Sequence, residues 1–189
     1  MKILAVTGTR ADLGIMLPVL RLLNEDERFQ LVTVVTGQHL SGDGQTYQEL
    51  FQLKNSQTRT LDITLPELDD AKALAQSMGH LATGMGLIIA EETPDIILGL
   101  GDRYELLGVA SAATIAKVPI AHIGGGDVTE GAFDDAIRHA VSKLSHVHFT
   151  TSEPSRLRLI QLGESRNRIL NVGNTSLDQL QELTLLPRE

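Results

Sequence analysis

The stretch HIGGGDVTEGAFDDAIRH, residues 122–139, combines three consecutive glycines with four acidic side chains and two histidines. Carboxylates and imidazoles can transfer protons during catalysis. Consecutive glycines leave the backbone bare, so that it can take positive φ angles or approach a bulky ligand closely. The stretch predicts a ligand-binding loop around Gly125, with Asp127 and Glu130 in the loop and Asp134 at the start of a helix.

The helix that follows this loop has an alternative, purely structural interpretation. Asp134 and Arg138 are four residues apart, as are Asp135 and His139, so that each pair shares a helix face. Acidic residues also stabilise the positive end of a helix dipole. Spacing alone leaves the catalytic and the structural interpretation equally open.

A second candidate segment, TGTRADLG at residues 7–14, follows a short apolar run. Gly8 permits a tight turn, and free amide groups at the next helix N-terminus can bind an anion beside the Arg10 guanidinium. The alternative is a turn glycine, a surface arginine and Asp12 as a helix cap. The segment matches neither the dinucleotide-binding nor the Walker phosphate-binding pattern.

Two further strand ends carry polar groups. Asp102 and Arg103 in LGDRYE place a potential acid or base beside a fixed positive charge, although Asp102 could simply cap a helix. Arg103 in a helix first turn would oppose the dipole, which favours a functional role. His39 in TGQHL is a weaker candidate for ligand contact, because loop histidines are often structural.

Metal and serine-hydrolase chemistry lack their sequence patterns. Histidine and aspartate residues in the 122–139 stretch could bind a metal, but no H-E-x-x-H or comparable spacing is present, and we expect none. No G-x-S-x-G nucleophile turn occurs either.

Short apolar runs alternate with amphipathic segments along the chain. The runs predict strands at 2–7, 30–36, 95–100, 119–123, 146–151 and 168–172, with an edge strand at 58–64. The segments predict helices near 12–24, 43–54, 69–92, 104–116, 134–145, 153–163 and 176–184. Strand–helix alternation indicates an α/β fold with a doubly wound, Rossmann-like parallel sheet. We expect one domain over residues 1–189, with a domain boundary near the end.

Composition narrows the function classes. A net charge of −8 opposes binding to nucleic acid or anionic lipid. The chain has no cysteine and so gives no sign of an oxidising compartment, and its N-terminus lacks a signal-peptide pattern, so we expect the cytoplasm by default. No apolar run is expected to approach membrane-spanning length. The apolar segment 78–92 could provide a surface for a homo-oligomer or pack in the core.

The strand-end motifs together resemble one enzyme family, the hydrolysing UDP-N-acetylglucosamine 2-epimerases of bacterial sialic-acid and related syntheses. The resemblance spans nearly the whole chain in motif order: GTRADLG, VVTGQHL, LGDRYELL, the stretch 122–151 and RILNVGNTSLD. It implies the N-terminal half of a two-domain, glycosyltransferase-B-like protein, with a UDP-sugar substrate and no nicotinamide or metal cofactor. The reaction implied removes the C2 proton, releases UDP to give 2-acetamidoglucal, and adds water to give N-acetylmannosamine.

The resemblance also assigns site residues. Arg10 and Arg103 would contact the diphosphate, Gly14 replaces a ligand-contacting serine of some relatives, and Asp102 and Asp134 match acidic residues of the sugar chemistry. Some relatives have glutamate where this chain has Gly124, so Asp127 or Glu130 could supply that carboxylate. A histidine and the uridine-binding residues belong to the missing C-terminal half, so little or no turnover is expected from these 189 residues alone.

Overall fold

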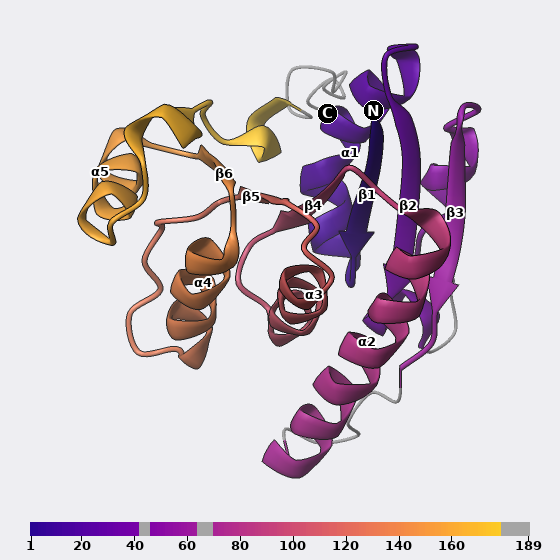
Figure 1. Ribbon diagram of the computed structural model, residues 1–189, viewed down its shortest axis with the longest axis horizontal. Helices are drawn as coiled ribbons and strands as arrows, with labels where there is room; N and C mark the ends of the chain where they lie inside the picture. Colours follow the sequence, from indigo (N-terminus) through magenta and orange to yellow (C-terminus); the bar gives the residue numbers. More distant parts are fainter. Residues whose placement is uncertain (42–45, 64–69, 179–189) are drawn as a thin grey trace, which may run out of the picture.

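The computed structural model describes residues 1–41, 46–63 and 70–178. Its centre is a sheet of seven parallel strands in the order β3-β2-β1-β4-β5-β6-β7 (Figure 1). The strands are β1 (Lys2–Thr7), β2 (Gln30–Thr36), β3 (Ser56–Leu61), β4 (Ile96–Leu100), β5 (Ile120–Ile123), β6 (Val147–Thr150) and β7 (Ile169–Asn171).

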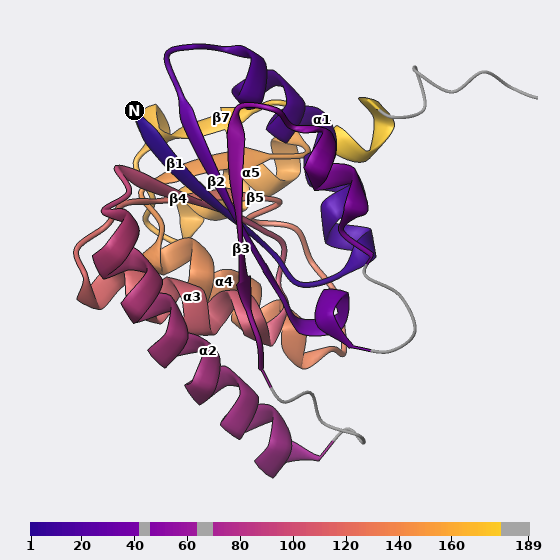
Figure 2. The same cartoon turned by 90° about the vertical axis from the view of Figure 1, so that its right-hand side faces the viewer.

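Helices cover the sheet from both sides. The α-helices are α1 (Arg10–Glu25), α2 (Ala71–Glu92), α3 (Tyr104–Ile115), α4 (Phe133–Leu144) and α5 (Glu153–Gln161). α2, α3 and α4 lie together on one side, while α1 lies on the other (Figures 1 and 2). This division follows from right-handed crossovers, because the chain moves one way across the sheet from β1 to β3 and the opposite way from β3 through β4 to β7.

Alternation along β1 explains the two apolar layers. Leu4 and Val6 belong to the layer under α2, α3 and α4, whereas Ile3 and Ala5 belong to the layer that includes α1. All four side chains are buried. Strands buried on both faces are the reason that the apolar runs in the sequence are nearly continuous. The predicted Rossmann-like parallel sheet is confirmed, and β3 is an edge strand as expected.

The prediction of a helix over 43–54 is wrong where the structure describes it. Residues 42–45 lie outside the described ranges, and only a short 3-10 helix, Gln48–Gln52, forms there. Leu50 inside it and the flanking Tyr47 and Leu53 are buried. These three recur every three residues, which is the period of a 3-10 helix rather than of an α-helix.

The C-terminal helix predicted over 176–184 is only partly described. A 3-10 helix spans Thr175–Leu177, and the part beyond residue 178 lies outside the described residues.

Helix α2 bears on the expectation that no apolar run approaches membrane-spanning length. By length and composition it is the one helix among the described residues that could cross a membrane. The expectation that no apolar run approaches that length is therefore wrong. Leu81, Met85 and Ile89 of α2 are buried in the core, which is usual for a helix of a globular domain.

Two glycines of the triple-glycine loop serve the fold itself. A Cβ atom on Gly125 would lie 2.9 Å from both His122 Nδ1 and Ser142 Oγ. Gly126 has a φ of +81°, and a Cβ there would lie 2.3 Å from the carbonyl oxygen of Ser155. The loop is bare because β5, α4 and α5 approach it closely.

Replacing Gly126 by alanine is expected to lower the free energy of unfolding by about 3 kcal/mol, because the positive φ and a backbone clash act together. Gly163 is the matched control, since its φ is +89° but a Cβ there meets nothing within 4 Å. Gly163→Ala should cost only about 1 kcal/mol. Urea denaturation measures both, and equal losses would contradict the proposed clash.

Candidate active site

The strand order reverses direction between β1 and β4, which are hydrogen-bonded neighbours at the middle of the sheet. In doubly wound sheets, ligands bind beyond the carboxyl ends of the strands at this reversal. Here the chain leaves β1 through Gly8 and Thr9 and leaves β4 through Gly101, Asp102 and Arg103. Two of the predicted motifs therefore meet at the point where such folds bind ligands.

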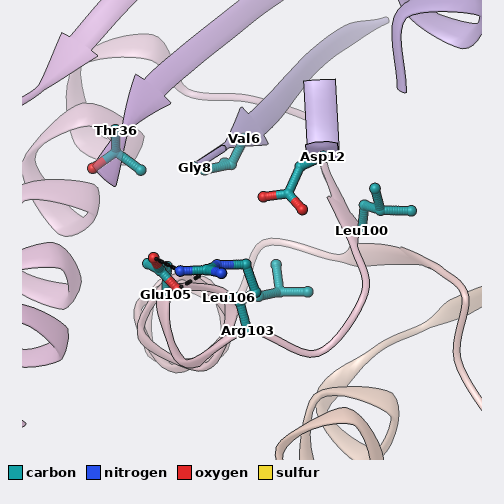
Figure 3. Close-up of a pocket in the computed structure, with 8 residues that line it drawn as sticks. All are labelled: Val6, Gly8, Asp12, Thr36, Leu100, Arg103, Glu105 and Leu106. Atoms are coloured by element: carbon teal, nitrogen blue, oxygen red, sulfur yellow. Dashed lines mark hydrogen bonds and ion pairs between the residues drawn. The ribbon is translucent and has the colours of Figure 1, made fainter. Parts of the chain in front are cut away.

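A hollow at this point contains both acidic and basic groups (Figure 3). It is lined by Val6, Gly8, Asp12, Thr36, Leu100, Arg103, Glu105 and Leu106.

Glu105 holds Arg103 at the floor of this hollow. Arg103 Nε and Nη2 donate to the two carboxylate oxygens of Glu105 at 3.1 and 2.9 Å (Figure 3). Glu105 is only 4% exposed, whereas 37% of the Arg103 side chain remains exposed. The fork fixes the guanidinium plane while leaving part of it open to the hollow.

Asp12 lies in the first turn of α1 and does not cap it. Thr9 is the cap, and its hydroxyl accepts from the Asp12 backbone amide at 3.1 Å. The interpretation of Asp12 as the cap is therefore wrong. Burial raises the pKa of the Asp12 carboxyl; nearby Glu105 adds to the increase, and Arg103 opposes it.

Asp102, on the other side of Arg103, pairs with a buried arginine of α4. Arg138 is 8% exposed, and its Nη2 donates to Asp102 Oδ2. Asp102 therefore does not act as the cap of α3, where Arg103 occupies the capping position without a side-chain cap. Burial raises the pKa of Asp102; the Arg138 charge opposes this rise, and the Asp134 charge reinforces it.

Arg138 is thus not the ordinary surface partner that its spacing from Asp134 suggested. Its Nε and Nη1 atoms are buried without a hydrogen-bond partner among the described residues. The second predicted pair does form, with His139 Nε2 lying 3.5 Å from Asp135 Oδ2.

A second hollow adjoins the first. Leu74, Arg103, Tyr104, Phe133 and Asp134 line it. Arg103 borders both hollows, so the β1, β4 and α4 motifs converge around one guanidinium. Asp134, from the 122–139 stretch, is thereby brought together with Asp102 and Arg103 of the LGDRYE motif.

His122 connects the strand ends behind this site. It is fully buried on β5, and its Nε2 lies 2.7 Å from the Gly101 carbonyl oxygen. Because a carbonyl only accepts, Nε2 carries the proton, and Nδ1 accepts from Ser142 Oγ at 3.1 Å. Burial lowers the pKa of His122 to about 4, so the neutral ring anchors the residue that precedes Asp102.

The remaining predicted residues of the first two strand ends lie at the same edge of the sheet. Arg10 is the exposed first residue of α1, and Gly14 is half-buried in its second turn. His39 is fully buried, and its ring nitrogens lie 3.0 Å from Thr7 Oγ1 and 2.7 Å from Thr46 Oγ1. The surroundings of His39 are those of a structural residue that ties β1 to the segment after β2.

The loop carboxylates diverge from one another. Asp127 accepts hydrogen bonds from Thr151 Oγ1, at 2.8 Å, and from Ser155 Oγ, and so fastens the loop to the start of α5. Glu130 is exposed. His122, Asp127 and His139, which were weighed as metal ligands, each have other partners within the described structure.

Sequence reasoning missed Glu105 and underrated Arg138. The signal for Arg138 was present, because it lies three residues before the apolar Val141 on one face of α4, where a charged residue requires a buried partner. For Glu105, the sequence shows only that it lies two residues after Arg103. That spacing does not predict a pair of hydrogen bonds between the two side chains.

Comparisons with known proteins agree with the motif resemblance. Residues 21–188 match the family described as UDP-N-acetylglucosamine 2-epimerase. The chain is 40% identical to the hydrolyzing UDP-N,N'-diacetylbacillosamine 2-epimerase of Legionella pneumophila, over all of this chain and 50% of that protein. It is 33% identical to the UDP-N-acetylglucosamine 2-epimerase of Neisseria meningitidis, over 97% of this chain and 48% of that protein.

A solved structure shows the same relation. The crystal structure of UDP-GlcNAc 2-epimerase from Neisseria meningitidis bound to UDP-GlcNAc superposes with a TM-score of 0.84 at 26% identity. The match covers 96% of this chain and 49% of that one. The chain therefore spans about half the length of the relatives it matches.

Acid is expected to destabilise the fold through His122. The folded pKa of about 4 lies below the ordinary value of 6.5, so the unfolded chain binds more protons between these values. This contribution is intact above pH 6.5, falls by on the order of 3 kcal/mol as the pH drops, and levels off below pH 4. His122→Gln should flatten the dependence in urea denaturation between pH 7.5 and pH 4.5, roughly spanning this window. An unchanged slope would contradict the assignment.

Removing the Arg138 charge should raise the pKa of Asp102 further, because that charge opposes the effect of burial. Arg138→Gln tests this by carboxyl ¹³C NMR titration of Asp102. Arg156→Gln is the matched control, since Arg156 pairs with Glu153 on α5. An Asp102 pKa that stays constant or falls in Arg138→Gln would refute the pairing.

Proposed function

The chain belongs to the UDP-N-acetylglucosamine 2-epimerase family, and from this membership we propose that it is the N-terminal domain of a hydrolysing nucleotide-sugar 2-epimerase. The complete enzyme would have two domains of the glycosyltransferase-B-like kind, with the sugar site on this domain. The observation that carries the proposal is the gathering of Asp102, Arg103 and Asp134 around the reversal of strand order.

The reaction that we propose has two steps. A carboxylate removes the proton from C2 of UDP-N-acetylglucosamine, the C1–O bond breaks, and its electron pair leaves with UDP. The product, 2-acetamidoglucal, has a C1–C2 double bond. Water then supplies a hydroxyl to C1. C2 receives a proton on the face opposite to the one from which the first proton was removed, which gives N-acetylmannosamine.

Asp102 and Asp134 are the proposed acid–base groups. Burial raises the pKa of Asp102, which makes its carboxylate a better proton acceptor than an exposed one. Arg138 fixes the position of this carboxylate through the hydrogen bond that its Nη2 donates to Asp102 Oδ2. Asp127 and Glu130 remain secondary candidates from the neighbouring loop.

Arg103 and Arg10 are the proposed diphosphate ligands. The exposed part of Arg103 and the exposed guanidinium of Arg10 lie at the carboxyl edge of the sheet, next to the N-terminus of α1. Guanidinium groups stabilise the negative charge that develops on a departing diphosphate. Gly14 and Gly125 would lie beside the ligand, and His39 would act by supporting the loop after β2.

The comparisons support an alternative sugar nucleotide as the substrate of the same reaction. The relative with 40% identity is described as acting on UDP-N,N'-diacetylbacillosamine, whereas the UDP-N-acetylglucosamine enzyme of Neisseria meningitidis is 33% identical. A diacetamido-trideoxy sugar nucleotide is therefore the alternative substrate for the same chemistry. The proposal places the enzyme in the cytoplasm, in sialic-acid or legionaminic-acid synthesis, and as a homo-oligomer.

Two other functions are compatible with half of such a protein. One is a non-catalytic module that binds a nucleotide sugar, and the other is half of a glycosyltransferase. Release of free glycal or free N-acetylmannosamine would separate the epimerase from a transferase, which delivers the sugar to an acceptor. Binding without any product would indicate the module.

The isolated chain is expected to bind UDP-N-acetylglucosamine weakly and to release little or no UDP, because half of each relative's length is absent from it. The measurement is UDP release at high protein concentration, with product analysis by NMR and with both sugar nucleotides. Arg103→Gln should weaken binding about tenfold by removing a charged contact, while Arg156→Gln on α5 serves as the control. Robust turnover by the chain alone would refute the need for a second domain.

A further inference from the structure

The second hollow has a charged side and an apolar side. Arg103 and Asp134 are its charged residues, and the rest of its lining comes from Leu74, Tyr104 and Phe133, which we call the apolar rim. Leu74 lies near the start of α2, while Tyr104 and Phe133 are the first residues of α3 and α4. Each of these helices lies on the same side of the sheet (Figures 1 and 2). The rim is therefore built where three neighbouring helices begin.

Phe133 is the most exposed member of the apolar rim. Its exposed fraction is 61%, whereas Leu74 and Tyr104 are half-buried. A single exposed apolar side chain is ordinary on a protein surface. Phe133, however, directly precedes Asp134 and lines the same hollow. Apolar and aromatic side chains around a few charged groups are the usual composition of a small-molecule site.

The apolar rim has little to offer a polar substituent. Leu74 and Phe133 have hydrocarbon side chains without hydrogen-bonding groups. Burial raises the pKa of Tyr104, and its hydroxyl interacts with the Glu105 carboxylate and with Ser77. These three described side chains therefore offer a ligand apolar contacts but no uncommitted donor.

The proposed reaction determines how a sugar ring would face the apolar rim. The diphosphate leaves from C1 and the proton leaves from C2, so these two carbons face Arg103 and Asp134 in the proposed complex. C4 and C5 lie on the opposite side of a pyranose ring, and C5 carries C6. The substituents of C4 and C6 therefore face the remaining lining of the hollow, which is the rim.

The two candidate sugar nucleotides differ at these positions. UDP-N-acetylglucosamine has hydroxyl groups on C4 and C6, whereas a 2,4-diacetamido-2,4,6-trideoxy sugar has an acetamido group on C4 and a methyl group as C6. Burying a hydroxyl without a partner is unfavourable, while burying a methyl group is favourable.

We propose that Leu74, Tyr104 and Phe133 determine substrate specificity, by contacting the C4 and C6 substituents and selecting a 6-deoxy sugar nucleotide over UDP-N-acetylglucosamine. This inference rests on the proposed function, because it uses the positions of C1 and C2 in the proposed reaction. It adds to that function the side chains that distinguish between the two substrates.

Calorimetric titration of the chain with UDP and with UDP-sugars tests the apolar rim. UDP-2-acetamido-2,6-dideoxyglucose lacks only the C6 hydroxyl of UDP-N-acetylglucosamine, and it should bind about tenfold more tightly. The UDP-linked diacetamido-trideoxy sugar should bind at least as tightly as the 6-deoxy compound. UDP has no sugar, so its affinity should not depend on the rim.

Substitutions of Phe133 test the contact itself. Phe133→Ala should reduce the preference for the 6-deoxy compound to about twofold or less and leave UDP binding unchanged. Phe133→Leu keeps an apolar side chain and should retain most of the preference. Phe51→Ala is the matched control, because Phe51 is 64% exposed but lies in the 3-10 helix whose Leu50 packs in the layer that includes α1.

The outcomes separate this inference from the proposed function. Equal affinities of the unchanged chain for the 6-deoxy compound and UDP-N-acetylglucosamine would overturn the inference alone. A preference that survives Phe133→Ala, or that Phe51→Ala abolishes equally, would do the same. Failure of the chain to bind any of the UDP-sugars would overturn the proposed function, and the inference with it.

Discussion

The structure depends on one constraint, namely that all seven strands are parallel and therefore end at the same edge of the sheet. Segments that are distant in sequence, such as TGTRADLG and LGDRYE, follow neighbouring strands β1 and β4. The reversal of chain direction between these strands separates the helices that follow them onto opposite sides of the sheet. The loops between strand and helix are thereby left open at that point, and the charged residues gather there.

The charged residues are arranged as two partly buried ion pairs that share one neighbourhood. Glu105 fixes Arg103 through a fork, and Arg138 contacts Asp102. Pairs of this kind contribute little to stability, because desolvation offsets the attraction. Their value is better explained by position, since Glu105 holds Arg103 at the edge of both hollows and Arg138 holds Asp102, the residue before it. His122 supports the segment that carries Asp102 and Arg103 through its hydrogen bond to the Gly101 carbonyl. Together, the strand order, the His122 imidazole and the two ion pairs therefore hold Asp102 and Arg103 in place.

Much of the fold was predictable, because buried parallel strands give continuous apolar runs such as KILAVT and QLVTVVT. The 43–54 segment was misjudged because its apolar residues recur every three positions, which a helical period of 3.6 matches only approximately. For the site, the strand-end positions of Asp102 and Arg103 followed from topology. The partner of Asp102 did not, since the contact between Arg138 and Asp102 joins residues 36 positions apart. Glu105 is only two residues from Arg103, but that spacing does not predict the two hydrogen bonds between them. The glycines of residues 124–126 suggested a ligand, whereas Gly125 and Gly126 are required by the packing of His122, Ser142 and Ser155.

The central claim is that the nucleotide sugar binds at the carboxyl ends of β1 and β4. Amide chemical-shift mapping by NMR during titration with UDP-N-acetylglucosamine tests it most directly. The largest changes should fall on residues 8–12, 101–105 and 133–134, which border the two hollows. Changes confined to the opposite edge of the sheet, or to the apolar surface around Phe149 and Val172, would contradict the account.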